Sequence, residues 1–174
     1  MNTITVRMIA ERAGVGHTLI TRYYGSRGRL LTIAIGITLM ELAHQIAAAP
    51  DVHAAVRSTF HQVLQSRELT SAINVASLDS VEQTDDFPVS DAFATQLSSA
   101  GATPERARER AATLTLMIFA WAAAEPRWLA MAHHADDPTT GRYEFQRTLL
   151  TLVDEAIHHQ PQPANSTSHI DNGP

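Results

Sequence analysis

The chain has 174 residues, a formal net charge of −5 at pH 7 and no cysteine, and hydrophobic residues make up 44% of it. The absence of cysteine excludes a disulfide framework and a thiolate metal site. We expect one small, cytoplasmic, all-α protein, because alanine is abundant, strand-type alternation is absent and Met1 to Ala10 lacks the apolar core of a signal peptide. We also expect no membrane contact, because no stretch looks long and apolar enough to span a bilayer.

The first expected element is a short helix, because apolar residues recur at helical spacing at Val6, Ile9, Ala10 and Ala13. Thr3 or Thr5 can cap its start, and Gly14 follows it, where a left-handed C-cap is favoured. A second helix should run from about Gly16 to Tyr24, with Ile20 on its apolar side and with His17, Thr18, Thr21 and Arg22 on the opposite side. Two short helices joined by a glycine-containing turn predict a helix-turn-helix that sets its second helix into the major groove of DNA.

Over about 26 residues the chain resembles the TetR/AcrR-type transcriptional regulators. The similarity rests on Thr5-Val6-x-x-Ile9-Ala10-Glu11-Arg12-Ala13-Gly14-Val15, on Leu19-Ile20-x-x-Tyr23-Tyr24-Gly25-Ser26-Arg27, and on Leu30-Leu31. The resemblance implies that Thr5, Tyr23 and Arg27 contact phosphates and that Tyr24 belongs to the core. It also implies that the residues facing the groove are His17, Thr18, Leu19 and Arg22.

The chain departs from this family at its start. Gly16 stands where the family usually caps the recognition helix with serine, and Thr21 replaces a commonly aromatic position. The family also places a full helix before the first one, whereas only Met1 to Ile4 precede it here. Two alternatives follow: the chain starts late, or the DNA-binding unit lacks the family's first helix and is loosely packed, which would expose Ile9, Ile20 and Tyr24.

Helix breakers divide the rest of the chain. A connecting helix is expected from about Gly28 to Ala48, before Pro50, with an apolar side made of Leu30, Ile33, Ala34, Ile37 and Met40. Further helices are expected over about 52–65, 68–77, 89–100 and 142–159. Another helix is expected over about 103–125, with a resumption through 131. We therefore expect a helix-turn-helix head with its connecting helix at 1–48, a helical body for effector binding and dimerisation at 49–159, and a disordered tail at 160–174.

The charge distribution separates the head from the body. Residues 1–49 carry five arginines against Glu11 and Glu41, a local charge of +3, whereas residues 50–174 carry eight arginines against sixteen acids, a local charge of −8. A basic end on an acidic body suits a protein that presents that end to phosphates.

The two last helices carry long apolar stripes that can pair with a second copy. The expected dimer-interface residues are Leu114, Ile118, Trp121, Phe145, Leu149, Leu152, Val153 and Ala156. The alternative is that both stripes fill the core of one chain, and periodicity cannot separate the two. The DNA-binding head favours a homodimer.

By the same resemblance, the body is expected to hold a small-molecule effector, with apolar or aromatic compounds as the default class. The candidate lining residues are Phe60, His61, Leu64, Asn74, Phe93 and Trp121. Asn74 is the best polar candidate, and its alternative is a solvated position on a helix surface.

Catalytic and metal-binding signals are missing. The neighbouring pairs His133-His134 and His158-His159 diverge by about 100° on a helix and do not converge on one ion. No HExxH, GxSxG, Walker-type loop or dinucleotide fingerprint occurs. We therefore expect no metal, no cofactor and no enzyme activity.

These observations predict a homodimeric, ligand-responsive transcriptional regulator, most simply a repressor, that binds double-stranded DNA at a palindromic operator. The alternative is a truncated all-α ligand-binding or dimerisation module that does not bind DNA.

Overall fold

The computed structural model describes residues 5–66 and 87–158. Every regular element in these two ranges is an α-helix, which confirms the all-α prediction. The helices are α1 (Val6–Ala13), α2 (His17–Tyr24), α3 (Arg27–Ala47), α4 (Val52–Gln65), α6 (Pro88–Ser99), α7 (Pro104–Met131) and α8 (Pro138–His158). The helix expected over 68–77 and the tail expected from residue 160 lie outside the described residues.

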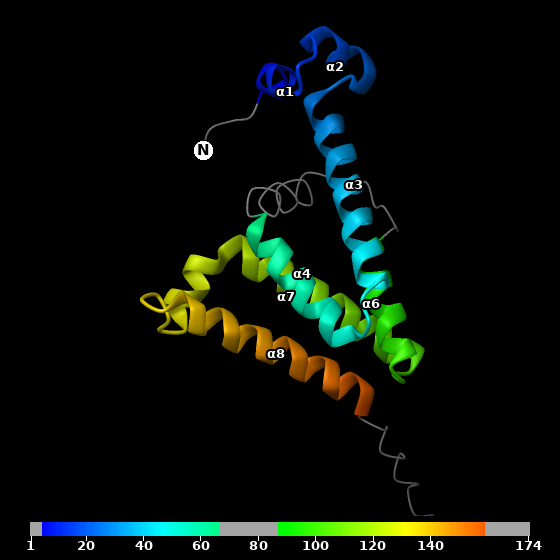
Figure 1. Cartoon of the computed structure of the whole chain (residues 1–174), viewed down its shortest axis with the longest axis vertical. Helices are drawn as coiled ribbons and strands as arrows, with labels where there is room; N and C mark the ends of the chain where they lie inside the picture. The colour runs from blue at the N-terminus through cyan, green and yellow to red at the C-terminus, as the bar shows by residue number, and fades with distance from the viewer. Residues whose placement is uncertain (1–4, 67–86, 159–174) are drawn as a thin grey trace, which may run out of the picture.

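Helix α3 joins a small head to a larger body (Figure 1). The head consists of α1 and α2 at the far end of α3; α1 packs on α2, and α2 packs on the start of α3. The opposite end of α3 packs mainly on α6 and also on α4. The division between head and body therefore lies within α3, rather than after residue 48, because Leu42 and Ile46 of α3 belong to the body core.

The body core is formed where α4, α6, α7 and α8 face one another. Helix α8 lies along α4 and α7, and α6 is enclosed between α3 and α7. The largest side chains with almost no exposure are apolar residues of these helices, namely Phe93, Ile46, Leu97, Leu114, Ile118 and Leu149. Packing in this core holds one end of α3, and the head lies at the other end of the same helix.

One helix boundary differs from the prediction for a local reason. Helix α7 reaches Met131 with a kink at Ala124, which agrees with the predicted resumption through 131, because Pro126 cannot donate a backbone hydrogen bond but the helix resumes after it. Helix α8 begins at Pro138 instead of near Arg142. Asp137 precedes this proline and accepts a hydrogen bond from the Thr140 backbone N–H at 3.2 Å, so Asp137 caps the helix and Pro138 is its first residue.

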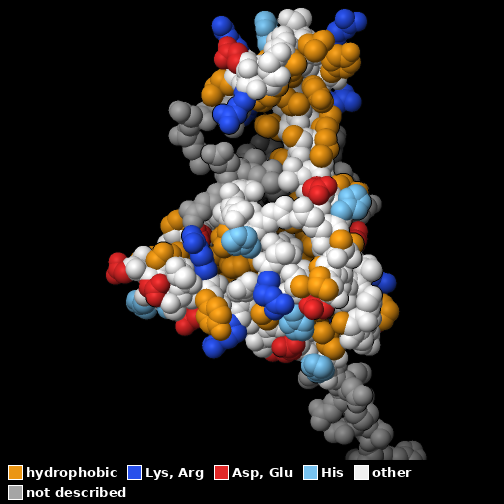
Figure 2. Space-filling model, viewed as in Figure 1, with side chains coloured by type: hydrophobic (Ala, Val, Ile, Leu, Met, Phe, Trp, Pro, Cys, Tyr) orange, Lys and Arg blue, Asp and Glu red, His pale blue; other side chains and the backbone are white. Residues whose placement is uncertain are grey.

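The apolar side expected for α3 is not the side that packs on the body. Ile33, Ile37 and Met40 are exposed, Ile37 by 67%, whereas the buried residues of α3 are Ile35, Leu42, Ala43 and Ile46. Figure 2 shows hydrophobic side chains along the upper part of α3. The prediction was wrong because this helix has two apolar sides, and helical spacing alone cannot tell which one meets the body.

The expectation that no segment is apolar and long enough to cross a bilayer is also wrong. Helix α3 passes that test of length and composition, with a mean hydropathy of 1.6 over its most apolar window. Only 17% of that window is buried. One such helix is weak evidence for a membrane, because the core helix of a soluble protein and a signal sequence pass the same test.

The corner between α7 and α8 depends on a glycine. A Cβ atom at Gly141 would overlap Leu129 Cδ2 and would lie 2.9 Å from His134 Cβ. We expect Gly141→Ala to lower the free energy of unfolding by about 1–3 kcal/mol, the usual cost of overpacking. Urea denaturation followed by circular dichroism measures this change.

Gly36 supplies the matched control for that prediction. It lies in α3, and a Cβ there would meet no atom within 4 Å. Gly36→Ala should therefore stabilise the protein by about 0.5–1 kcal/mol through helix propensity alone. Equal unfolding midpoints for the two variants would show that the Gly141 corner is not tightly packed.

Candidate nucleic-acid interface

The turn between α1 and α2 has the conformation that its residue types favour. Thr5 caps α1 by accepting a hydrogen bond from the Met8 N–H at 3.2 Å, which leaves its hydroxyl proton available for a further acceptor. Gly14 ends α1 in the left-handed region, with φ 67° and ψ 26°, and the Val15 N–H donates back to the Ala10 carbonyl at 3.0 Å. This closure turns the chain sharply and sets α2 across α1.

Helix α2 turns one side inward and leaves the rest open to solvent. Ile20 is buried, Tyr24 is half-buried, and the exposed residues include His17, Thr18, Leu19, Arg22 and Tyr23. Tyr23 is 73% exposed and Leu19 is 46% exposed, so both side chains are accessible to a partner. The Thr21 hydroxyl donates to the His17 carbonyl at 3.2 Å, so its proton is already used within the helix.

A tight turn at Gly25 places a further arginine beside α2. The Ser26 N–H donates to the Tyr24 carbonyl at 2.8 Å around Gly25, whose φ of 73° and ψ of −58° favour glycine. Ser26 then caps α3 by accepting from the Arg29 N–H at 3.1 Å, and Arg27 is the first residue of that helix. Arg27 and Arg22 are exposed, and neither makes an ion pair with another described residue.

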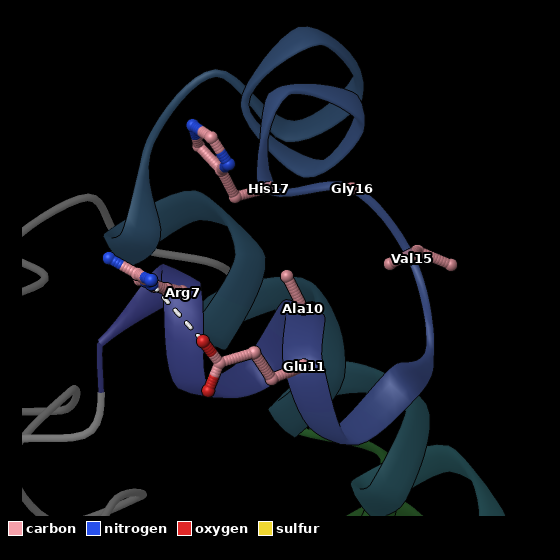
Figure 3. A pocket seen from close by; sticks show the side chains of 6 residues that line it. All are labelled: Arg7, Ala10, Glu11, Val15, Gly16 and His17. Carbon is pink, nitrogen blue, oxygen red and sulfur yellow. Dashed lines mark hydrogen bonds and ion pairs between the residues drawn. The ribbon is translucent and has the colours of Figure 1, made fainter.

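A shallow hollow lies between α1 and the start of α2 (Figure 3). It encloses about 470 Å³ and is lined by Arg7, Ala10, Glu11, Val15, Gly16 and His17. Arg7 and Glu11 form an ion pair at 3.1 Å on one wall, and His17 stands on the opposite wall. Gly16 gives α2 no side-chain cap, so the first N–H groups of α2 depend on water or on a bound molecule.

All seven residues expected to contact DNA therefore lie on the head surface. Thr5 is at the start of α1, Arg27 is at the start of α3, and the others are on α2: His17, Thr18, Leu19, Arg22 and Tyr23. Of the residues expected to be exposed by an incomplete head, Ile20 is buried, and Ile9 and Tyr24 are half-buried. Ala10 and Ile20 are nevertheless the only fully buried residues over the described range 5–30, so the head has a very small core of its own.

The structure places some of the residues expected to line an effector pocket in the body core and others at the surface. Phe60 and Trp121 lie in the body core on either side of Phe145; the Trp121 and Phe145 rings stack with centroids 4.1 Å apart, and Phe60 follows at 5.6 Å. Phe93 is fully buried and Leu64 is half-buried. His61 is exposed and lies 2.7 Å from the Gln65 amide nitrogen, so it belongs to the surface. Asn74 lies outside the described residues.

The apolar stripes assigned to a second copy are mostly core of the single chain. The residues with no more than 1% exposure are Leu114, Ile118, Leu149, Val153 and Ala156. Side chains that are already buried within one chain offer no surface to another, so the dimer assignment of these residues is wrong. Trp121 is 7% exposed, and Phe145 and Leu152 are half-buried.

Titratable groups form pairs between elements of the body. His53 lies 2.8 Å from Asp154, and His134 lies 3.0 Å from Glu144, so each pair ties α8 to a neighbouring element.

A hydrogen bond from the Thr140 side chain, aided by the Thr140 backbone N–H, holds the pKa of Asp137 below its usual value. No group of three or more potential metal ligands gathers within 5–66 and 87–158.

Sequence reasoning missed two polar contacts of the body. Glu125 is 1% exposed and accepts a hydrogen bond from Arg142 Nε, which joins the kinked end of α7 to the start of α8. Gln96 of α6 donates to backbone carbonyls at the end of α3. The backbone closes the end of α3 in part, since the Ala48 N–H donates to the His44 carbonyl and the Ala49 N–H donates to the Ile46 carbonyl. Nothing in the local sequence identifies Gln96 as a further donor.

Comparison with known proteins adds no further assignment: no family model matches this chain, and neither the curated proteins nor the solved structures contain a match.

Proposed function

We propose that this protein is a sequence-specific, DNA-binding transcriptional regulator, of the kind that the resemblance to TetR/AcrR-type regulators implies. The observation that carries the proposal is the open side of α2, where Thr18, Arg22 and Tyr23 stand free beside Arg27. Arginine pairs with guanine edges and phosphates, and threonine and tyrosine hydroxyls bind phosphates or bases. The local charge of +3 over residues 1–49 adds a favourable field for a polyanion.

The proposed regulator is a cytoplasmic homodimer with no enzyme activity, and it reads a palindrome because a twofold dimer presents two copies of α2. Since the core-facing sides of α7 and α8 are filled within one chain, the second copy would pack on their outer sides. Leu116 of α7, which is 70% exposed, is a residue of that kind. The proposal involves no contact with a membrane.

A small-molecule effector would act by preferring one arrangement of the two heads over another. The body core offers a polar atom for such a ligand, because the buried Trp121 Nε1–H has no hydrogen-bond partner in the described part of the chain. The neighbouring Phe145 ring would suit a flat aromatic compound. Release of DNA on effector binding would make the protein a repressor.

The test is a fluorescence-anisotropy titration against duplexes from the DNA upstream of the gene, repeated at several salt concentrations. Phosphate contacts predict that log K falls linearly with log salt. Tyr23→Ala should weaken all duplexes alike by about 1 kcal/mol, as expected for a lost phosphate contact. Arg22→Ala should instead change the order of preference among duplexes. If both variants bind every duplex as the parent does, α2 is not the recognition helix.

A second function is favoured by the small core of the head. Two eight-residue helices with two fully buried side chains have little packing to hold them together. The chain would then be an all-α ligand-binding or dimerisation module that does not bind DNA. Hydrogen exchange separates the two functions, because this alternative predicts fast exchange of all amides in α1 and α2 and slow exchange in α7.

A further inference from the structure

The lower end of α3 is capped by a side chain from another helix. The Gln96 amide nitrogen lies 3.0 Å from the Ile46 carbonyl oxygen, 3.3 Å from that of Ala47 and 3.2 Å from that of Ala49. Helix α3 ends at Ala48 in a right-handed conformation, with no glycine to close it. The last carbonyls of a helix lack their usual partners within that helix. The Ala49 N–H donates to the Ile46 carbonyl at 3.2 Å, and the two N–H groups of the Gln96 amide are shared among the three carbonyls within reach.

This contact is placed where α3 leaves the body. Helix α6 packs along the lower part of α3, and Phe93 and Leu97 of α6 are fully buried, as is Ile46 of α3. Among the described residues, the side-chain hydrogen bonds between α3 and the body all come from Gln96. Apolar packing between α3 and α6 already restricts their crossing angle, and hydrogen bonds to the carbonyls at the end of α3 add a directional restraint to it.

Small rotations at this end become large displacements at the head. Since a helix rises about 1.5 Å per residue, Arg27 lies roughly 30 Å from Ala47 along α3. A tilt of about 10° would move Arg27 by roughly 5 Å, more than the ~3.4 Å axial spacing of phosphates along one strand. The direction of α3 must therefore be held within a few degrees if two heads are to meet their half-sites.

We propose that Gln96 is a positioning residue that fixes the direction in which α3 carries the head. Its consequence for DNA affinity rests on the proposed function, but the positioning itself does not. Any ligand or contact that displaces α6 would withdraw the Gln96 amide from the α3 carbonyls and release the head.

The test measures a distance within the full chain. Because the protein has no cysteine, the double variant Thr32→Cys and Thr151→Cys can carry two spin labels at exposed sites on α3 and α8. Electron–electron resonance then gives the distribution of label distances, with excess unlabelled protein added to dilute contacts between copies. We expect a single narrow maximum for the parent, and loss of that maximum for Gln96→Leu and for Gln96→Asn, whose shorter side chain cannot reach the same carbonyls.

Gln45→Leu is the matched control. Gln45 is an exposed glutamine of α3 that donates to Glu41 within the same helix, so its loss should leave the distances unchanged. A lower melting temperature for Gln96→Leu with an unchanged distribution would mean that the residue only stabilises the fold, and would overturn the proposal. If Gln96→Leu does not fold, the label distances of Gln96→Asn decide the question by the same criterion.

The measurement is independent of DNA, so its failure can be told apart from failure of the proposed function. Broadened distances in a chain that binds no DNA would support the positioning role and contradict the regulator. Unchanged distances in a Gln96 variant, together with normal DNA binding by the parent chain, would contradict the positioning role and support the regulator.

Discussion

Arg142→Met is expected to lower the free energy of unfolding by about 1.5–3 kcal/mol, the usual contribution of a hydrogen bond to a charged group. Arg142 Nε donates to the carboxylate of Glu125, which is 1% exposed, whereas the Arg142 side chain is 41% exposed. The substitution keeps the length and most of the packing of the side chain but removes the positive charge that faces Glu125. Urea denaturation at neutral pH, followed by circular dichroism, measures the loss.

Two further variants show whether charge is the cause. The double variant Glu125→Leu with Arg142→Met removes both charges and should recover most of the lost stability, because a buried ion pair can often be replaced by apolar residues of similar volume. Arg147→Met, at an exposed position of the same helix, should change stability by less than about 0.5 kcal/mol. A loss below ~1 kcal/mol for Arg142→Met alone would contradict the assigned role of the pair.

Reversal of two charges on the head should abolish specific DNA binding. In the proposed complex Arg22 faces bases and Arg27 faces a phosphate, and both are exposed in the free protein. Since each arginine contact contributes about 1–3 kcal/mol, Arg22→Glu with Arg27→Glu should weaken binding on the order of a thousandfold. Fluorescence anisotropy with the preferred duplex measures the change, and the melting temperature should stay near that of the parent.

The control makes the same change of net charge on the body. Arg57→Glu with Arg147→Glu reverses two exposed arginines of α4 and α8. If both double variants lose affinity equally, the effect comes from total charge, and α2 has no special part in DNA binding. A loss confined to the head variant ties the affinity to that surface.

Local signals predicted the helices α1 and α2 and most helix boundaries correctly. Thr5, Ser26 and Asp51 each cap a helix with the side-chain oxygen that their type suggests, and Gly14 has the left-handed conformation expected of it. Such signals act over three or four residues, so a single sequence contains the whole interaction. The exposed side of α2 followed from the same local reasoning, since Ile20 marks the buried side.

Contacts between distant residues could not be predicted in this way. The apolar stripe that includes Leu149 and Val153 has the same spacing whether it packs on α7 of its own chain or on a second copy. In the structure these two side chains are buried within the single chain. The packed side of α3 depends on where α6 lies, which the sequence of α3 does not contain. Glu125 and Gln96 find their partners 17 and 50 residues away in the chain, beyond any periodic pattern.

We expect the two apolar sides of α3 to differ in their tolerance of charged residues when each position is substituted. At Ile46 or Leu42, lysine and glutamate should destroy the fold, because these side chains are enclosed by the body. At Ile37 the same replacements should leave folding intact and improve solubility. If cells do not tolerate a charged residue at Ile37, this side chain contacts another molecule. The tolerated substitutions along α3 would thus distinguish positions needed for folding from positions needed for association.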